Sequence, residues 1–197
     1  MRVVLGVSGA SGAVLALDCA RALARLGAEI DLVVSAMAER TLAEEVGAAA
    51  LSDLRSLATR VHDQRDLGAG IASGSCPVAG MIVAPCSMRS LAAIAHGFDD
   101  GLLTRAAGVQ LKERRPLVLL AREAPLTLAH LENMQAATRM GAVILPPVPA
   151  FYLRPQSLAE ATAQIAARAV DLLRLGPPLA QAWAPARPVP HGGDQHD

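Results

Sequence analysis

The sequence predicts one α/β domain built on a doubly wound parallel sheet of the flavodoxin or Rossmann type. Short runs of β-branched and other apolar residues alternate with stretches whose apolar residues recur at helical spacing, which is typical of repeated βα units. The first such run passes directly into a glycine-rich turn and a helix. A chain of 197 residues can bury a sizeable core in one such domain and is short for two. We place the domain at residues 1–176 and treat 177–197 as a C-terminal arm or tail.

The first βα unit predicts a phosphate site. Val3–Val7 has a strand pattern, and the helix after the turn ends at Gly27 and carries one apolar side, formed by Leu15, Cys19, Leu23 and Leu26. The glycines of the turn would let the backbone approach a phosphate, and the helix start would supply free N–H groups. Their spacing is not GxGxxG, and the serines favour a mononucleotide such as FMN. A tight turn without a ligand is the alternative.

The second unit runs from the strand Ile30–Val34 into a helix over Ala36–Val46. Ser35 stands at the junction, where it can cap the helix and also contact a phosphate or ribityl group. Glu44 and Glu45 end this helix, where negative charge is unfavourable. We therefore expect one of them to be held by a partner cation or to act in the site; a solvated helix end is the alternative.

The middle of the chain supplies a second polar turn. A helix and a short strand, Arg60–His62, fill Ala48–Asp66. Gly68–Gly80 is too rich in small residues to pack, so we expect a mobile loop that contacts ligand. After the strand Met81–Ala84, the segment Pro85–Ser90 carries hydroxyls into the helix Leu91–His96 and predicts another anion-binding helix start. Cys86 within it is interpreted as a packed thiol.

The stretch Arg105–Glu123 concentrates positive charge and contains Lys112, the only lysine of the chain. It predicts a basic helix over Leu102–Arg115 that Pro116 stops, then a strand, Leu117–Ala121, with an Arg–Glu pair at its carboxyl end. Residues 105 and 112 would share one helix face, about 10 Å apart along the axis. This arrangement favours binding a phosphorylated substrate and moving a proton on it. A solvated basic helix end is the alternative.

The C-terminal part completes the alternation. It predicts a helix over Leu126–Met140, a strand over Ala142–Leu145, an extended proline-rich run that leads to Tyr152, and a long helix over Ser157–Leu175 that carries Arg168. His191 and His196 in the tail have poor spacing for a metal site.

Composition excludes several classes of function. The 18 basic and 18 acidic residues balance, and aromatic residues make up 2% of the chain, which argues against nucleic-acid binding. No apolar run is long enough to cross a membrane, and the N-terminal segment is interrupted by glycine, serine and Asp18, unlike a signal peptide. Three cysteines without metal spacing suit a reducing compartment, so we expect a cytoplasmic protein.

Taken together, these blocks resemble the flavin prenyltransferases (UbiX-like proteins) over about residues 2–175, in the same order. The matching blocks are GVSGASG at Gly6–Gly12, Ser35 with Glu45 ten residues on, PCSMRSLAAIAHG, DGLLTRAAGVQLKERRPLVLLARE and PPVPAFYLRP. The resemblance implies that reduced FMN is alkylated at N5 by dimethylallyl monophosphate and then closed at C6. It further implies a flavodoxin-like subunit, no metal, a homododecamer with sites at subunit junctions, and delivery of prenylated FMN to a UbiD-type decarboxylase.

The resemblance also implies roles for individual residues. Those expected to hold FMN are Gly9, Ala10, Ser11, Ser35, Ser87, Met88, Arg89, Ser90 and Arg122. Those expected to hold the prenyl phosphate are Ser73, Arg105, Lys112, Tyr152 and Arg168. Glu123 would handle protons on the leaving phosphate, with Lys112, Glu45 and Ser11 completing the catalytic set. The chain departs from the family pattern at Gly108, where aspartate is usual, and at Gly101, where many members have asparagine.

Physical chemistry agrees with the implied reaction, because Arg and Lys side chains can stabilise a leaving phosphate without a metal. Asp99 and Asp100 lack the second acidic cluster that diphosphate prenyltransferases use to hold magnesium. Three alternatives stay open. One is a cysteine decarboxylase of the same fold, for which His96 or His130 would be catalytic. The second is a non-catalytic flavin carrier, and the third is direct decarboxylation of an aromatic acid with FMN as the electron sink.

Overall fold

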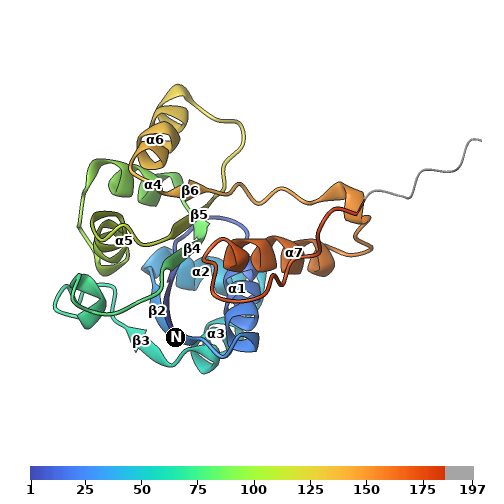
Figure 1. The fold of residues 1–197 in the computed structure, drawn as a ribbon, viewed down its shortest axis with the longest axis horizontal. Helices are drawn as coiled ribbons and strands as arrows, with labels where there is room; N and C mark the ends of the chain where they lie inside the picture. The colour runs from blue at the N-terminus through green and yellow to red at the C-terminus, as the bar shows by residue number, and fades with distance from the viewer. Residues whose placement is uncertain (185–197) are drawn as a thin grey trace, which may run out of the picture.

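The computed structural model describes residues 1–184 as a six-stranded, all-parallel sheet with helices on both faces (Figure 1). The strand order is β3-β2-β1-β4-β5-β6, which confirms the doubly wound prediction and is the Rossmann order rather than that of flavodoxin. Val4 of β1 pairs with Asp31 of β2 and with Met81 of β4, so β1 and β4 are neighbours at the centre. The strands are β1 (Arg2–Val7), β2 (Glu29–Val34), β3 (Arg60–His62), β4 (Met81–Cys86), β5 (Leu117–Ala121) and β6 (Val143–Ile144).

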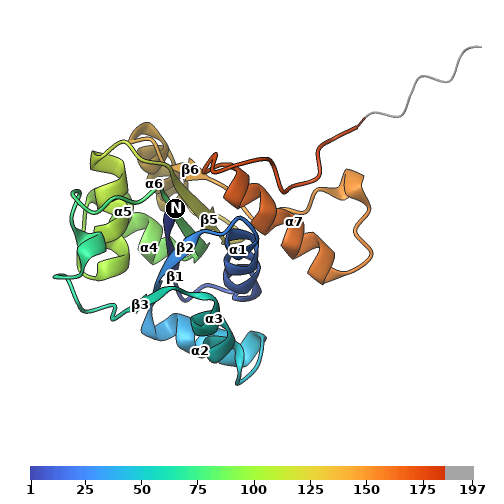
Figure 2. The same ribbon diagram turned by 60° about the horizontal axis from the view of Figure 1, so that its bottom comes forward.

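Two layers of helices cover the sheet (Figure 2). One layer holds α1 (Val14–Arg25), α2 (Ala36–Glu45), α3 (Ala50–Leu57) and α7 (Leu158–Asp171). The other holds α4 (Met88–His96), α5 (Leu102–Lys112), α6 (Leu128–Arg139) and the short 3₁₀ turn η1 (Gly70–Ala72); a second 3₁₀ turn, η2 (Phe151–Leu153), precedes α7. No helix in this part of the chain is long and apolar enough to cross a membrane.

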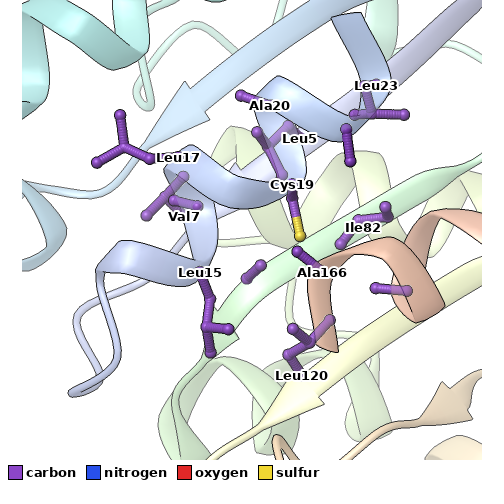
Figure 3. Packing of buried hydrophobic residues seen from close by; sticks show 14 of the residues in the cluster. Leu5, Val7, Leu15, Leu17, Cys19, Ala20, Leu23, Ile82, Leu120 and Ala166 are labelled. Atoms are coloured by element: carbon purple, nitrogen blue, oxygen red, sulfur yellow. The ribbon is translucent and has the colours of Figure 1, made fainter. Parts of the chain in front are cut away.

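Each strand contributes side chains to the cores on both faces of the sheet, because successive side chains point to opposite faces. In β1, Val3 and Leu5 join the cluster under α1 and α7, whereas Val4 joins the cluster under α5. Figure 3 shows part of the first cluster, in which Cys19 of α1 packs with Ile82 of β4 and Ala166 of α7. The sheet is thus buried on both sides, as a parallel sheet requires.

The basic helix is shorter than the sequence predicts. Helix α5 ends at Lys112, three residues before the predicted end at Arg115. Arg114 adopts a left-handed conformation, with φ of 57°, and the N–H of Arg115 donates to the carbonyl of Gln110 at 2.9 Å. This closure satisfies the last carbonyls of the helix and turns the chain toward β5.

The N-terminus of α5 is capped from a distant loop. Its N-cap residue, Gly101, has no side chain, and Gln64 takes that role: its carbonyl accepts the N–H of Leu102 at 2.8 Å and its Oε1 accepts the N–H of Leu103 at 3.1 Å. A Cβ at position 101 would lie 2.3 Å from Gln64 Nε2. The glycine therefore leaves room for the substitute cap.

We expect Gln64→Ala to lower the free energy of unfolding by about 1 kcal/mol, because the Leu103 N–H loses its acceptor. The midpoint of thermal unfolding should fall by about 2–4 °C. Gln64→Glu, which keeps the accepting oxygen, is the matched control and should lose less. Equal losses for the two variants in thermal melts would contradict the capping role.

The C-terminal arm lies on its own α7 as far as the structure describes it. The Asp171 carboxylate accepts the N–H groups of Leu179 and Ala180, and Gln164 exchanges two hydrogen bonds with Gln181. The proline-rich end of the predicted tail, with His191 and His196, lies outside the described residues. We propose 1–176 as the functional domain and 177–197 as its arm.

Candidate functional site

The turns after β1 and β4 lie side by side at the carboxyl edge of the sheet. Ser8, which is buried, joins them: its hydroxyl donates to the carbonyl of Pro85 at 2.9 Å and accepts the N–H of Ser87 at 2.7 Å. The strand order reverses at this point, and such crevices bind ligands in open α/β sheets. The serines of the turn after β1 are predicted hydroxyl donors to a phosphate, but the Ser8 hydroxyl donates to the carbonyl of Pro85 instead.

Helices α2 and α4 both begin at this edge, and each is capped by a serine. The hydroxyl of Ser35 accepts the N–H of Ala38 at the start of α2, as predicted. The hydroxyl of Ser87 accepts the N–H of Ser90 and donates to its hydroxyl at 3.1 Å at the start of α4. Each start can offer N–H groups and a positive dipole end to a phosphate. Met88 and Arg89 begin α4, and Arg89 pairs with Asp100.

Gly9 must be a glycine because the first turn of α2 packs against it. A Cβ there would lie 2.3 Å from the Cβ of Met37, closer than real side chains approach. The glycine-rich turn therefore sits directly against the Ser35-capped helix. This contact brings Gly9, Ala10 and Ser11 next to the start of α2.

The start of α1 is occupied by a carboxylate of the same chain. Glu45 Oε2 accepts the N–H of Gly12 at 2.8 Å and that of Ala13 at 2.9 Å. These are the N–H groups that the sequence assigned to a phosphate. Glu44 pairs with Arg40, which confirms that one of the two glutamates is held by a cation, whereas backbone N–H groups hold Glu45.

The surroundings of Glu45 keep it ionised. Partial burial raises its pKa, but hydrogen bonds from the N–H of Ala13, the hydroxyl of Ser11 and the N–H of Gly12 lower it by more. The nearby charge of Arg122 acts in the same direction. The net pKa lies below the ordinary value, so Glu45 accepts hydrogen bonds rather than donating a proton at neutral pH.

The lowered pKa predicts an acid-dependent contribution to stability. Because the pKa of Glu45 is lower in the folded state, its stabilisation is full above the ordinary value of 4.5 and is lost as pH falls through the folded pKa. We expect Glu45→Gln to cost about 1 kcal/mol or less near pH 7, since solvent reaches the carboxylate. Unfolding measured from pH 7 to pH 3 checks this. A difference between variant and wild type that grows on acidification would contradict it.

A cavity of about 360 Å³ adjoins these turns. The polar part of its wall consists of Ser11, Glu45 and Arg122. Arg122 is the residue directly after β5, and its backbone N–H donates to the carbonyl of Cys86 at 3.2 Å. Glu123 follows, exposed, with Oε1 accepting the N–H of Ala124 at 3.1 Å. The remaining wall is mostly apolar and comes from α1, α7 and the proline run, including Leu15, Pro147, Pro149, Leu158, Ala161 and Ile165.

Cys86 belongs to this edge but has no free reactive surface. Its side chain is buried among the residues under α4 and α5, and burial raises the pKa of its thiol to about 12. The predicted packed thiol is confirmed.

The predicted cations of α5 share one face and hold the small-residue loop. Arg105 Nε donates to the carbonyl of Ala72 at 3.1 Å, and Lys112, paired with Glu113, lies against Gly74. Arg115 donates to the carbonyls of Gly74 and Cys76 at 2.7 and 2.9 Å. These bonds attach the loop around Ser73 to α5 and to the residues after it, and Ile71 and Ala72 are buried, so the segment packs, contrary to the expectation that its residues are too small to do so. The acceptors are backbone carbonyls, and the amino-acid types of the loop do not indicate which carbonyls will be used.

Tyr152 and Arg168 line a separate cavity of about 460 Å³ between α7, the proline run and the arm. Trp183 contacts Tyr152 edge to face, with ring centroids 5.1 Å apart. Trp183 had no predicted role, and its proximity to Tyr152 could not be foreseen from sequence spacing. This cavity shares Ile165 with the cavity at Ser11, so the two are adjacent across the proline run.

Within one chain, Lys112 and Arg168 lie in opposite layers. Lys112 ends α5, which packs on one face of the sheet, and Arg168 is on α7, which packs on the other (Figure 1). Lys112 also lies just before β5, at the amino edge of the sheet, whereas Ser11 and Arg122 lie at the carboxyl edge. A single chain therefore does not bring all the predicted phosphate ligands together.

The two histidines of the cysteine decarboxylase alternative have structural partners. His96 Nε2 lies 2.9 Å from Asn133 Oδ1 between α4 and α6. His130 forms a capping box with Thr127 at the start of α6. Neither lines the cavity at Ser11. Residues 1–184 contain no group of three potential acidic, histidine or cysteine metal ligands.

Comparisons with known proteins agree with this geometry. A family model described as "Flavoprotein" matches residues 1–168. A Thauera aromatica protein named "Flavin prenyltransferase UbiX" is 52% identical over 93% of this chain and 94% of its own length. The crystal structure of AnUbiX (PadA1) in complex with FMN and dimethylallyl pyrophosphate matches with a TM-score of 0.90 and 46% identity, covering 94% of this chain and 98% of that one. A dodecameric FMN-dependent Ubix-like decarboxylase from Escherichia coli O157:H7 matches with a TM-score of 0.89 and 42% identity, covering 94% and 100%.

Proposed function

This chain belongs to the UbiX family of flavin prenyltransferases, and we propose that it transfers the dimethylallyl group of dimethylallyl monophosphate to N5 and C6 of reduced FMN. The observation that carries the proposal is the site itself: two serine-capped helix starts and Arg122 meet at the switch point of the sheet, beside an apolar cavity. Among the relatives, the AnUbiX structure contains both FMN and dimethylallyl pyrophosphate.

The residues of the carboxyl edge fit FMN. The N–H groups at the starts of α2 and α4, with the hydroxyls of Ser35, Ser87 and Ser90, provide donors for a phosphate. Glu45 already occupies the start of α1, so these two helix starts are the better phosphate cradle. The remaining residues proposed to contact FMN are Gly9, Ala10, Ser11, Met88, Arg89 and Arg122. Reduced FMN, when bound, supplies the nucleophilic N5 for the transfer.

Two sets of residues, from different elements, bind the donor phosphate through cationic side chains and hydroxyls. Ser73, Arg105 and Lys112 come from the η1 and α5 face, and Tyr152 and Arg168 come from the α7 face. Because these groups lie in opposite layers of one chain, a second copy completes the site. A closed homo-oligomer, which we propose to be a dodecamer, supplies that copy.

The same residues stabilise the departing phosphate. Preorganised Arg and Lys donors offset the charge that develops on its oxygens as the bond to the allyl carbon breaks. Glu123 gives a proton to the leaving oxygen, while ionised Glu45 orients the Ser11 hydroxyl. The apolar wall formed by Pro147, Pro149 and Leu158 keeps water from the allyl group. No step requires a metal. The product then passes to a UbiD-type decarboxylase.

The experiment is to mix the purified protein, dithionite-reduced FMN and dimethylallyl monophosphate without oxygen and with a chelator. We expect the flavin mass to rise by one prenyl unit and an equal amount of phosphate to appear. Unchanged flavin would refute the proposal. A flavin carrier would bind FMN without releasing phosphate, and a cysteine decarboxylase would instead release carbon dioxide from a peptidyl or pantothenoyl cysteine.

A further inference from the structure

Asp99 occupies space that Gly108 leaves open. Asp99 lies in the turn before α5, and Gly108 lies in the middle of that helix. A Cβ built at position 108 would lie 3.3 Å from Asp99 Oδ1, which is tighter than an ordinary contact. A side chain at 108 would therefore press on the Asp99 carboxylate. A mid-helix glycine costs about 1 kcal/mol relative to alanine, so its presence calls for a local benefit.

The other oxygen of Asp99 holds Arg105. Arg105 Nη1 donates to Asp99 Oδ2 at 2.9 Å, and its Nε donates to the Ala72 carbonyl at 3.1 Å. The guanidinium is thus fixed on two sides, between the turn before α5 and the loop that carries Ser73. Arginine has five N–H donors, so these two bonds leave about three for an anion.

A carboxylate at position 108 could also reach Arg105. Residues 105 and 108 are three apart on α5, and such residues are neighbours on a helix surface. A carboxylate at either 99 or 108 can therefore anchor the same guanidinium, but the two side chains compete for one space.

We propose that Asp99 is a positioning residue that aims Arg105 at the donor phosphate, and that Gly108 is the gap that admits its carboxylate. This inference rests on the proposed function, because it takes Arg105 as a ligand of the donor. Asp99 does not touch the donor; it acts by fixing the guanidinium.

Removing Asp99 has two opposing effects on donor binding. It frees Arg105 to rotate, which weakens binding, and it removes a negative charge near the phosphate, which strengthens binding. The pair is partly open to solvent, with side-chain exposures of 40% for Arg105 and 33% for Asp99, so the charge effect is screened. The loss of the charge-assisted anchor is the larger effect.

The test measures steady-state kinetics of the FMN-loaded oligomer with dimethylallyl monophosphate. We expect Asp99→Ala to raise KM for the donor about tenfold, with FMN affinity unchanged and kcat changed less than KM. Asp99→Asn keeps an accepting oxygen and should stay within about threefold of wild type. Adding Gly108→Asp to Asp99→Ala should restore most of the loss, a rescue that a general destabilisation would not give.

Three results would overturn the inference: an unchanged KM for Asp99→Ala, a lowered KM, or no rescue by Gly108→Asp. If Asp99→Ala does not fold, Gly108→Val tests the same contact, because the valine side chain displaces the Asp99 carboxylate. A wild-type KM for the donor in Gly108→Val would also refute the positioning role of Asp99. Arg105→Ala separates the two proposals. If Arg105→Ala leaves the donor KM unchanged, the donor-binding role of Arg105 fails; if Arg105→Ala raises KM and Asp99→Ala does not, only the positioning role fails.

Discussion

Glu123→Gln should lower the rate of prenyl transfer by about 10²–10⁴-fold, because glutamine cannot give a proton to the leaving phosphate. Glu123 follows β5 at the carboxyl edge of the sheet, next to Arg122, which lines the cavity at the glycine-rich turn. Its side chain is exposed and bonds only locally, so we expect the fold and FMN affinity to survive.

Single-turnover reactions with saturating donor measure this effect, with flavin mass and phosphate as readouts. Glu132→Gln is the control, because Glu132 is another exposed glutamate, on α6, and does not line the cavity at Ser11. Wild-type turnover in Glu123→Gln would remove Glu123 from the mechanism. Loss of FMN in that variant would instead assign it to flavin binding.

Lys112→Ala should lower kcat/KM for the donor by about 10²–10³-fold, the cost of removing one preorganised donor to developing charge. Lys112→Arg should recover only part of the activity, because a planar guanidinium is not equivalent to a compact ammonium. FMN affinity should stay unchanged, because Lys112 is assigned to the donor phosphate and not to FMN. Equilibrium titration of FMN and initial rates check both expectations.

A nearby cation provides the control for Lys112. Arg139 lines the same surface cavity as Lys112, so Arg139→Ala removes positive charge there without removing a residue assigned to the donor. Equal losses in the two variants would mean that general electrostatic attraction, rather than a placed ammonium, accounts for the effect of Lys112. Wild-type rates in Lys112→Ala would contradict the assignment outright.

The sheet and its turns follow from local sequence pattern. Apolar runs such as Leu117–Ala121 are buried on both faces of a parallel sheet, and glycine or serine at their ends marks the switch to a helix. The positions of Ser35 and Arg122 could therefore be predicted, because each is fixed by the strand it follows. Helix ends were less predictable, as α5 shows.

Long-range partners could not be predicted. Asp31 is fully buried in β2 and is held by Arg2 and by His62, which lies 2.8 Å away on β3. Nothing in the spacing of these residues reveals that their strands are adjacent. The same holds for Ser8, which joins two turns, and for Glu45, which fills a helix start expected to hold phosphate.

The most consequential feature that could not be predicted is the separation, into two helical layers, of the residues proposed to bind the prenyl donor. Arg105 and Lys112 could be placed on one helix face from their spacing, but their separation from Arg168 depends on which layer each helix joins. Hydrophobic periodicity gives the buried side of a helix and not the face of the sheet that it covers. The proposed reaction thus requires a site that two copies of the chain complete.

Mixed oligomers test that claim most directly. Subunits with Lys112→Ala and subunits with Arg168→Ala are each expected to be inactive alone. The two kinds of subunit are co-expressed with different tags and purified together as mixed oligomers. These oligomers should recover about a quarter of wild-type turnover, because about a quarter of the junctions would contain both intact residues. A double variant mixed with wild type should give the same fraction if the two residues act from different copies. If the mixed single variants stay as inactive as either parent while the double variant mixed with wild type keeps about half the activity, the two residues act within one chain and the account is wrong.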